Sequence, residues 1–170
     1  TYSEDELKRI IYTYGEENFA PQIAGKIVSA RAEKPIETTL ELVDIIKSAM
    51  PAKAKIGGHH PAKRTFQAIR IAVNSELEHL SVALDKAFSC LKVGGRLCII
   101  TFHSLEDRLV KQRFASWCKG CTCPPEFPVC ICGKKPLVKL ISRKPIVSGE
   151  AELAENPRAR SAKLRVCEKL

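Results

Sequence analysis

Residues 94–111 read GGRLCIITFHSLEDRLVK, and this stretch indicates the class of the fold. Two glycines make a turn, and residues 96–102 are short, apolar and rich in β-branched side chains, which predicts a buried strand. Ser104 predicts the cap of a following helix, with Asp107 as its partner three residues on. Before the turn, residues 65–91 carry apolar side chains at helical spacing, which predicts one long or once-broken helix. Helix, turn, strand and helix in this order are typical of α/β proteins.

Helical patterns fill the first fifty residues. Gly15 predicts the end of one helix, and a second helical pattern follows over residues 16–30. Residues 52–64, AKAKIGGHHPAKR, contain a Gly-Gly pair and four Lys or Arg side chains, which predicts an exposed basic loop. Two capping boxes of the S/T-x-x-E type predict helix starts, Ser3 with Glu6 and Thr38 with Glu41.

Two further strands are predicted near the end of the chain. Residues 137–141 and 162–166 alternate in polarity and can pair, with a small helical turn at 150–155 between them. The strand at 97–100 is apolar on both faces, so it is expected inside a sheet that helices cover on both sides. The nine glycines include no G-x-G pair, so the turn that opens most nucleotide-binding α/β folds is absent. We therefore expect the cofactor half of the fold to lie outside this chain.

Composition and charge narrow the class of protein. The chain has 170 residues, with 28 Lys and Arg against 19 Asp and Glu, a net charge of +9. No apolar run approaches the roughly 18 residues that a membrane span needs. The first residues alternate acidic and basic side chains, so no secretory signal is expected, and the expected location is the cytoplasm. The positive surplus favours a polyanionic partner, with nucleic acid as the first candidate.

Three motifs in order carry a resemblance to a known family. They are HPAKRTFQAIRIAVNSEL (60–77), GGRLCIITFHSLEDRLVK (94–111) and ENPRARSAKLRV (155–166). Together they resemble the bacterial small-subunit ribosomal RNA (cytidine N4)-methyltransferases, the methyltransferase H or MraW-like family. The similarity extends over essentially the whole chain and includes YGEE (14–17) and ETTLEL (37–42).

The resemblance implies a specific fold and activity. It implies S-adenosylmethionine-dependent methylation of the exocyclic N4 of a cytidine in small-subunit ribosomal RNA. The fold it implies is the C-terminal part of a class I, Rossmann-like methyltransferase sheet preceded by a helical insertion. Residues 1–60 would belong to the insertion, and 61–170 to the methyltransferase domain with a Cys-rich loop at 118–133. In this family the cofactor turn precedes residue 1, so no cofactor-binding residue is assigned here and the chain alone is expected to be inactive.

Candidate catalytic residues directly follow the predicted strand, because α/β proteins place functional groups beyond the carboxyl ends of strands. An exocyclic amine is a poor nucleophile, so methyl transfer to it needs groups that orient the NH2 and exclude water. His103 is the candidate to accept or relay a proton, and Ser104 the candidate to bind the base edge or a phosphate. The alternative is that Ser104 only caps the helix and His103 is a hydrogen-bonded loop residue.

Basic side chains within the three motifs are candidates for RNA contact. Phosphate contacts supply salt-dependent affinity without choosing a sequence. The alternatives are an ordinary solvated surface or, for Arg64 and Arg70, a buried ion pair. Two guanidinium groups two residues apart suit a phosphate or acidic side chains of the fold equally well. The candidates are Lys63, Arg64, Arg70, Arg158 and Arg160.

A cysteine-rich loop is the remaining chemical feature. Five cysteines lie between residues 118 and 132, and four thiolates can bind zinc tetrahedrally. The alternatives to zinc are reduced cysteines that bind no metal, and an adventitious disulfide. Cys90 and Cys98 lie on apolar faces and are expected in the core. The ligands predicted for a structural zinc ion are Cys118, Cys121, Cys130 and Cys132.

The competing hypothesis is that the chain has no catalytic function. In that case the chain is a basic nucleic-acid-binding module with a Cys-rich knuckle, which the missing cofactor turn favours. For the methyltransferase, the expected partner is small-subunit ribosomal RNA or the subunit itself. The strand at 96–102 would expose an unpaired edge without its neighbours, so self-association of the chain is predicted.

Overall fold

The computed structural model describes residues 2–51, 60–121, 123–124, 129 and 131–170. Its two compact units are Thr1–Glu76 and Leu77–Leu170, and each is described by itself. The sequence-based boundary falls after residue 60, whereas α4 (Lys63–Asn74) packs on α1 (Glu4–Gly15) and so belongs to the first unit. The assignment of the two parts to an insertion and a methyltransferase domain stays a prediction.

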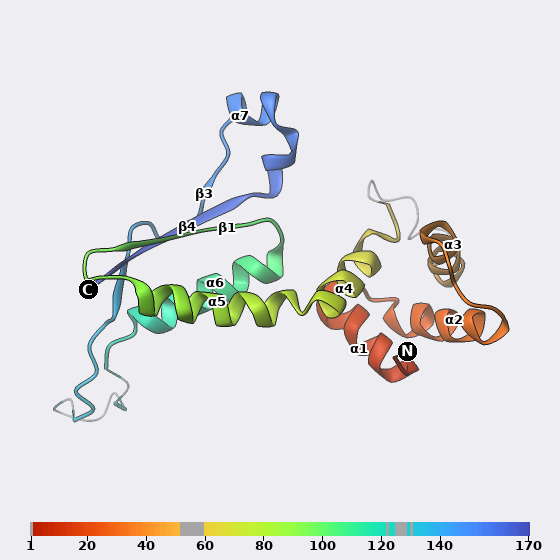
Figure 1. Ribbon diagram of the computed structural model, residues 1–170, viewed down its shortest axis with the longest axis horizontal. Helices are drawn as coiled ribbons and strands as arrows, with labels where there is room; N and C mark the ends of the chain where they lie inside the picture. Colours follow the sequence, from red (N-terminus) through yellow and green to blue (C-terminus); the bar gives the residue numbers. More distant parts are fainter. Residues whose placement is uncertain (1, 52–59, 122, 125–128, 130) are drawn as a thin grey trace. The chain divides into compact units, whose positions relative to one another are not determined.

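The described part of the first unit contains four helices, and two of their starts confirm the sequence analysis (Figure 1). Ser3 Oγ accepts the Glu6 N–H at 3.3 Å, and the Glu6 carboxylate accepts the Ser3 N–H at 2.7 Å. Thr38 and Glu41 form the same reciprocal cap. Besides α1 and α4, the helices are α2 (Ala20–Glu33) and α3 (Thr39–Ala49).

Gly15 is the last residue of α1, as predicted, but it does not itself adopt the left-handed conformation that often ends a helix. The left-handed residue is Glu16, with φ of 49°. A Cβ on Gly15 would lie 2.9 Å from the carbonyl oxygen of Arg64, so the glycine permits α1 and α4 to approach closely. The second helix begins at Ala20 and not at residue 16, because the chain first turns through Glu16.

The core of the first unit is aliphatic. Side chains from α1, α2 and α3 bury one another, in the pattern that their helical spacing predicts. The inward face of α3 is as predicted, with Ile46 fully buried and its apolar neighbours packed beside it. Members of this core are Leu7, Ile11, Ala20, Ile23, Ala24, Ile27, Ile46 and Met50.

The helical pattern of residues 65–91 breaks once. Ser75 adopts a left-handed conformation with φ of 49°, which ends α4 before α5 (Glu76–Cys90) begins. Within the part of the chain that the structure describes, none of the helices combines the length and the apolar character that a membrane span requires.

The second unit contains a small sheet, the two long helices α5 and α6, and a short helical segment formed by α7 and η2 (Figure 1). The predicted helical turn at 150–155 is confirmed as α7, and the short β3 was not predicted. In chain order after α5 come β1 (Arg96–Thr101), α6 (Ser104–Cys118), β2 (Val138–Leu140), β3 (Ile146–Val147), α7 (Glu150–Glu155), the 3-10 turn η2 (Pro157–Ser161) and β4 (Lys163–Lys169).

The strand order is β1-β4-β2, with β3 also pairing with β4, and all these pairings are antiparallel. The predicted pairing of the two C-terminal strands is therefore confirmed. Because β1 and β2 are both antiparallel to β4, they run parallel to one another, and α6 connects them. A parallel pair joined through a helix is the crossover unit of α/β proteins, here with the last strand inserted between its two strands.

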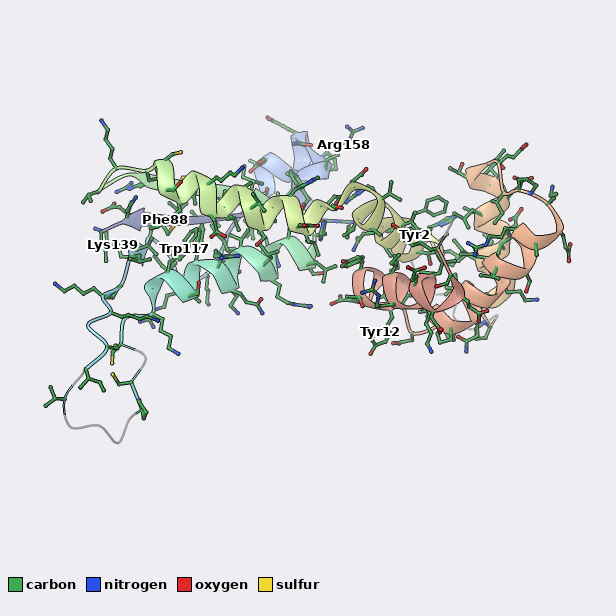
Figure 2. All side chains as sticks on the ribbon, turned by 60° about the horizontal axis from the view of Figure 1, so that its bottom comes forward. Tyr2, Tyr12, Phe88, Trp117, Lys139 and Arg158 are labelled. Carbon is green, nitrogen blue, oxygen red and sulfur yellow. The ribbon has the colours of Figure 1, made fainter. Side chains whose placement is uncertain are left out.

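Helices α5 and α6 cover one face of this sheet. Leu97 and Ile99 of β1 pack against a core that includes Phe114, and Phe88 stacks on Trp117 with ring centroids 4.5 Å apart (Figure 2). This face of the sheet supplies the unit's hydrophobic core.

The opposite face of β1 is open in the described residues. Ile100 is 60% exposed, so the expectation that helices cover the strand on both sides is wrong for this unit by itself. Cys98 on the same face and Cys90 at the end of α5 are both exposed. The prediction that these two cysteines lie in the core is therefore wrong. Among the described cysteines the buried thiol is that of Cys167, and burial raises its pKa to about 11.

Candidate functional site at one end of the sheet

The strand register brings two of the resemblance motifs to the same end of the sheet. Thr101, the last residue of β1, pairs with Lys163, the first residue of β4. His103 lies two residues beyond the end of β1, and Arg160 lies three residues before the start of β4. The two chain segments therefore meet where β1 ends and β4 begins, although they are far apart in the sequence (Figure 1).

His103, and not Ser104, caps helix α6. The Nδ1 atom of His103 accepts the Glu106 N–H at 3.3 Å. In return the Glu106 carboxylate accepts the Phe102 and His103 N–H groups at 2.9 and 3.2 Å. Glu106 Oε1 also lies 3.4 Å from His103 Nε2. The sequence-based cap is one residue too late, because an imidazole nitrogen accepts the same hydrogen bond that a hydroxyl would.

Ser104 therefore does not have the capping role that the sequence analysis predicted. It is the first residue of α6, it is exposed, and its hydroxyl makes no hydrogen bond to the described residues. A hydroxyl at the first turn of a helix, beside backbone N–H groups that point outward, is available to an incoming polar ligand.

Asp107 does not cap α6 but holds the helix to the sheet. The side chain is almost buried, and Arg165 of β4 binds it with two hydrogen bonds of 2.7 and 3.1 Å. Lys163 Nζ lies 3.5 Å from the same carboxylate. The Arg165 hydrogen bonds hold the pKa of Asp107 below its ordinary value of 3.8, against the effect of burial. The alternation of basic residues 163 and 165 places both on one face of β4 but does not identify Asp107 as their partner.

Arg158 and Arg160 are both exposed on η2, on either side of the buried Ala159. Figure 2 shows Arg158 on the outside of this turn. Neither guanidinium forms an ion pair with the described residues, even though α7 nearby carries three glutamates. Pairing with acidic residues of the fold, one of the two alternatives for these arginines, is therefore not seen here.

The other basic candidates lie in the first unit. Lys63 begins α4 and is exposed, without a partner among the described residues. Arg64 donates to the carbonyl oxygen of Glu16 at 3.4 Å, beside the C-terminus of α1 where a positive charge is favourable. Arg70 binds Glu76 with hydrogen bonds of 2.7 and 3.1 Å. Residues 52–59 of the predicted basic loop lie outside the described residues.

The cysteines predicted as zinc ligands separate into two places. Cys121 and Cys132 lie together, and Cys123 joins them. Cys118 instead packs against the core of the second unit, where burial raises the pKa of its thiol. Cys130 lies outside the described residues.

Comparisons with known proteins agree with the three motifs. The family model described as "MraW methylase family" matches residues 1–170. A ribosomal RNA small subunit methyltransferase H from Lachnospira eligens is 60% identical over all 170 residues of the chain, which cover 54% of that protein. Proteins of the same name from Clostridioides difficile and a Paenibacillus species are 59% and 57% identical over 170 residues, covering 55% and 54% of their lengths. The chain thus spans about half the length of these relatives.

Proposed function

Because this chain belongs to the MraW methylase family, we propose that it supplies the substrate-side part of an enzyme that methylates small-subunit ribosomal RNA. The observation that carries the proposal is the end of the sheet where β1 leads into His103 and Ser104 and where η2, with Arg158 and Arg160, leads into β4. Neither arginine has an ion-pair partner among the described residues. The parallel strands β1 and β2, connected through α6, support the class I methyltransferase architecture. Sheets of this kind place their sites beyond the carboxyl ends of strands, which is where His103 and Ser104 lie.

The proposed reaction transfers a methyl group from S-adenosylmethionine to the exocyclic N4 of a cytidine. The amine lone pair is delocalised into the base, so the protein must orient the NH2 group and keep water away. Ser104 contacts the base edge with its unbonded hydroxyl. His103 fixes the start of α6 through Nδ1, and the same nitrogen takes up the departing proton when it releases the Glu106 N–H.

We propose that S-adenosylmethionine is not held by the described residues alone. The turn from β1 to α6 contains Phe102 and His103 and no glycine, so it does not resemble the turn that cradles a nucleoside cofactor. Gly94 and Gly95 lie at the opposite end of β1. We propose that the cofactor site lies mostly outside this chain, and that the residues named above act on the RNA.

Arg158, Arg160 and Lys63 are the proposed phosphate contacts, because they are exposed and have no partner among the described residues. Arg64 and Arg70 have structural partners within the first unit, so their contribution to RNA binding is secondary. Contacts of this kind position the RNA without reading its sequence.

The test is a chimera in which this chain replaces the matching segment of the Lachnospira eligens relative. Labelled methyl transfer from S-adenosylmethionine to the small subunit or its RNA is measured for the chimera and for the chain alone. We expect transfer by the chimera and none by the chain. A chimera that folds and binds S-adenosylmethionine but never methylates small-subunit RNA would contradict the proposal and favour the non-catalytic binding module.

Two variants of the chimera assign the roles. Arg158→Ala with Arg160→Ala should reduce the slope of log K against log salt by about 1.4, for two contacts to single-stranded RNA. Arg143→Ala, another exposed arginine of the second unit, is the control and should leave the slope unchanged. His103→Asn retains a good cap but removes the imidazole, so methyl transfer should fall by about 100-fold without a change in stability.

A further inference from the structure

Three cysteine sulfurs meet in the loop between α6 and β2. The Sγ atoms of Cys121, Cys123 and Cys132 all lie within 4.8 Å of one another. At the neck of the loop, the Leu137 N–H donates to the Trp117 carbonyl oxygen at 2.8 Å. The loop therefore leaves α6, returns beside it, and brings thiols from two separate stretches of chain to one point.

The spacing of the sulfurs is that of a metal thiolate site. Zinc bound tetrahedrally at about 2.3 Å from each sulfur separates neighbouring sulfurs by about 3.8 Å. The Sγ atoms of Cys121 and Cys132 are 3.7 Å apart. A tetrahedral ion thus requires almost no rearrangement of this pair.

The backbone and the charges around the cluster suit sulfur ligands. The Cys123 N–H donates to the Cys121 Sγ at 3.3 Å, which fixes these two sulfurs relative to one another. Lys119, Lys134 and Lys135 flank the cysteines and are exposed. Their charges offset the negative charge of several thiolates around one divalent ion.

Packing does not account for the cluster. Thiols without a chemical role are usually buried as small apolar side chains, as Cys167 is, whereas Cys121 and Cys132 are exposed. Val129 and Ile131 are 69% and 76% exposed, so the described part of the loop has no hydrophobic core of its own. In such a loop a bound metal ion can supply the order that packing does not.

We propose that Cys121, Cys123 and Cys132 bind a zinc ion as thiolates, and that the ion holds the loop between α6 and β2 in shape. Thiolates select zinc over magnesium or calcium, whose preferred ligands are oxygen atoms. A ligand other than these three residues completes the tetrahedron. Each cysteine thiol loses a proton on binding, so the affinity decreases as the pH falls. The site is structural, and it does not depend on the proposal for RNA methylation.

The test uses the reduced chain and metal ions alone. The metal is first removed, and one equivalent of zinc is then added and measured after gel filtration. We expect close to one zinc per chain, and cobalt in its place should give the intense visible bands and the sulfur-to-metal charge transfer of a tetrahedral thiolate site. Less than about half an equivalent of zinc, or a cobalt spectrum without sulfur charge transfer, would overturn the proposal.

Single substitutions identify the ligands. Cys121→Ser, Cys123→Ser and Cys132→Ser should each weaken zinc binding at least tenfold, measured by competition with a chromophoric chelator. Cys90→Ser removes an exposed thiol outside the loop and is the matched control. Cys118→Ala should also keep the metal. Loss of zinc from Cys118→Ala, or unchanged binding by the three serine variants, would refute this ligand set.

Zinc should also change the loop in a way that does not require a variant. In the wild-type chain, zinc should protect three thiols from alkylation and slow proteolytic cleavage between α6 and β2. Equal alkylation and equal cleavage with and without zinc would contradict a structural site.

Discussion

Asp107 is the residue whose loss should affect stability most clearly. Its side chain is 12% exposed, and its carboxylate accepts two hydrogen bonds from Arg165, whose side chain is 11% exposed. Asp107→Asn leaves the guanidinium buried without its counter-charge, so the free energy of unfolding of the second unit should fall by about 3 kcal/mol. Urea unfolding followed by the fluorescence of Trp117, the chain's single tryptophan, measures this unit.

The same residue predicts how stability depends on pH. The pKa of Asp107 is lower in the folded chain than its ordinary value of 3.8, so its contribution is complete above that pH and disappears as the pH falls below it. Asp107→Asn should therefore flatten the loss of stability in acid. The control is Asp44→Asn, because Asp44 is 80% exposed and only 3.9 Å from Lys47, a surface pair of less than about 1 kcal/mol. Equal acid sensitivity of the wild type and Asp107→Asn would contradict this assignment.

At the scale of helices, the contact between α1 and α4 depends on Gly15. A Cβ there would meet the Arg64 carbonyl oxygen at 2.9 Å, and backbone cannot move aside as a flexible side chain can. Gly15→Ala should destabilise the first unit by about 1–3 kcal/mol, measured by the near-UV signal of the chain's three tyrosines, all in α1 or just before it.

Gly25 in α2 is the matched control for that substitution. A Cβ at Gly25 would approach only the carboxylate of Glu4, at 3.3 Å, and that side chain can move. Gly25→Ala should therefore be neutral or stabilising, by up to about 1 kcal/mol, because alanine favours a helix interior. The opposite order of the two variants would show that α1 and α4 do not meet at Gly15.

Local rules predicted those elements whose stabilising contacts are local. The capping boxes at Ser3 and Thr38 are hydrogen bonds between residues three apart, so the sequence contains both partners. The cap of α6 was misassigned because hydroxyl statistics favoured Ser104, although Glu106 lies three residues after His103 and marks the true box. The two-residue β3 is too short to show any periodicity.

Contacts over long sequence distances limited the rest. The alternation of residues 162–166 predicted a strand, but the pairing of Arg165 with Asp107 joins β4 to α6 and required the folded register. Likewise, the close spacing of the cysteines suggested a site, whereas only the path of the loop shows that Cys123 lies with Cys121 and Cys132. For β1, apolar residues on both faces do not say what covers the second face.

For the chain as a whole, the free edge and the open face of β1 predict self-association. In the described residues β1 pairs with β4 alone, so its other edge has free backbone groups, and Ile100 beside that edge is 60% exposed. Such an edge can pair with the same edge of another molecule. Light scattering on the chain should therefore give a mass above that of the monomer, increasing with concentration.

A charge on the open face should suppress this association. Ile100→Lys adds a lysine next to the free edge, where it opposes pairing, and should return the mass toward that of the monomer. Leu40→Lys, at an apolar residue of the first unit that is 74% exposed, is the control and should leave association unchanged. The chimera with the remaining part of a relative should also be less associated, because the open face of β1 would then be covered. A chain that stays monomeric at high concentration would show that β1 needs no further partner, and it would weaken the case that another part of the protein packs there.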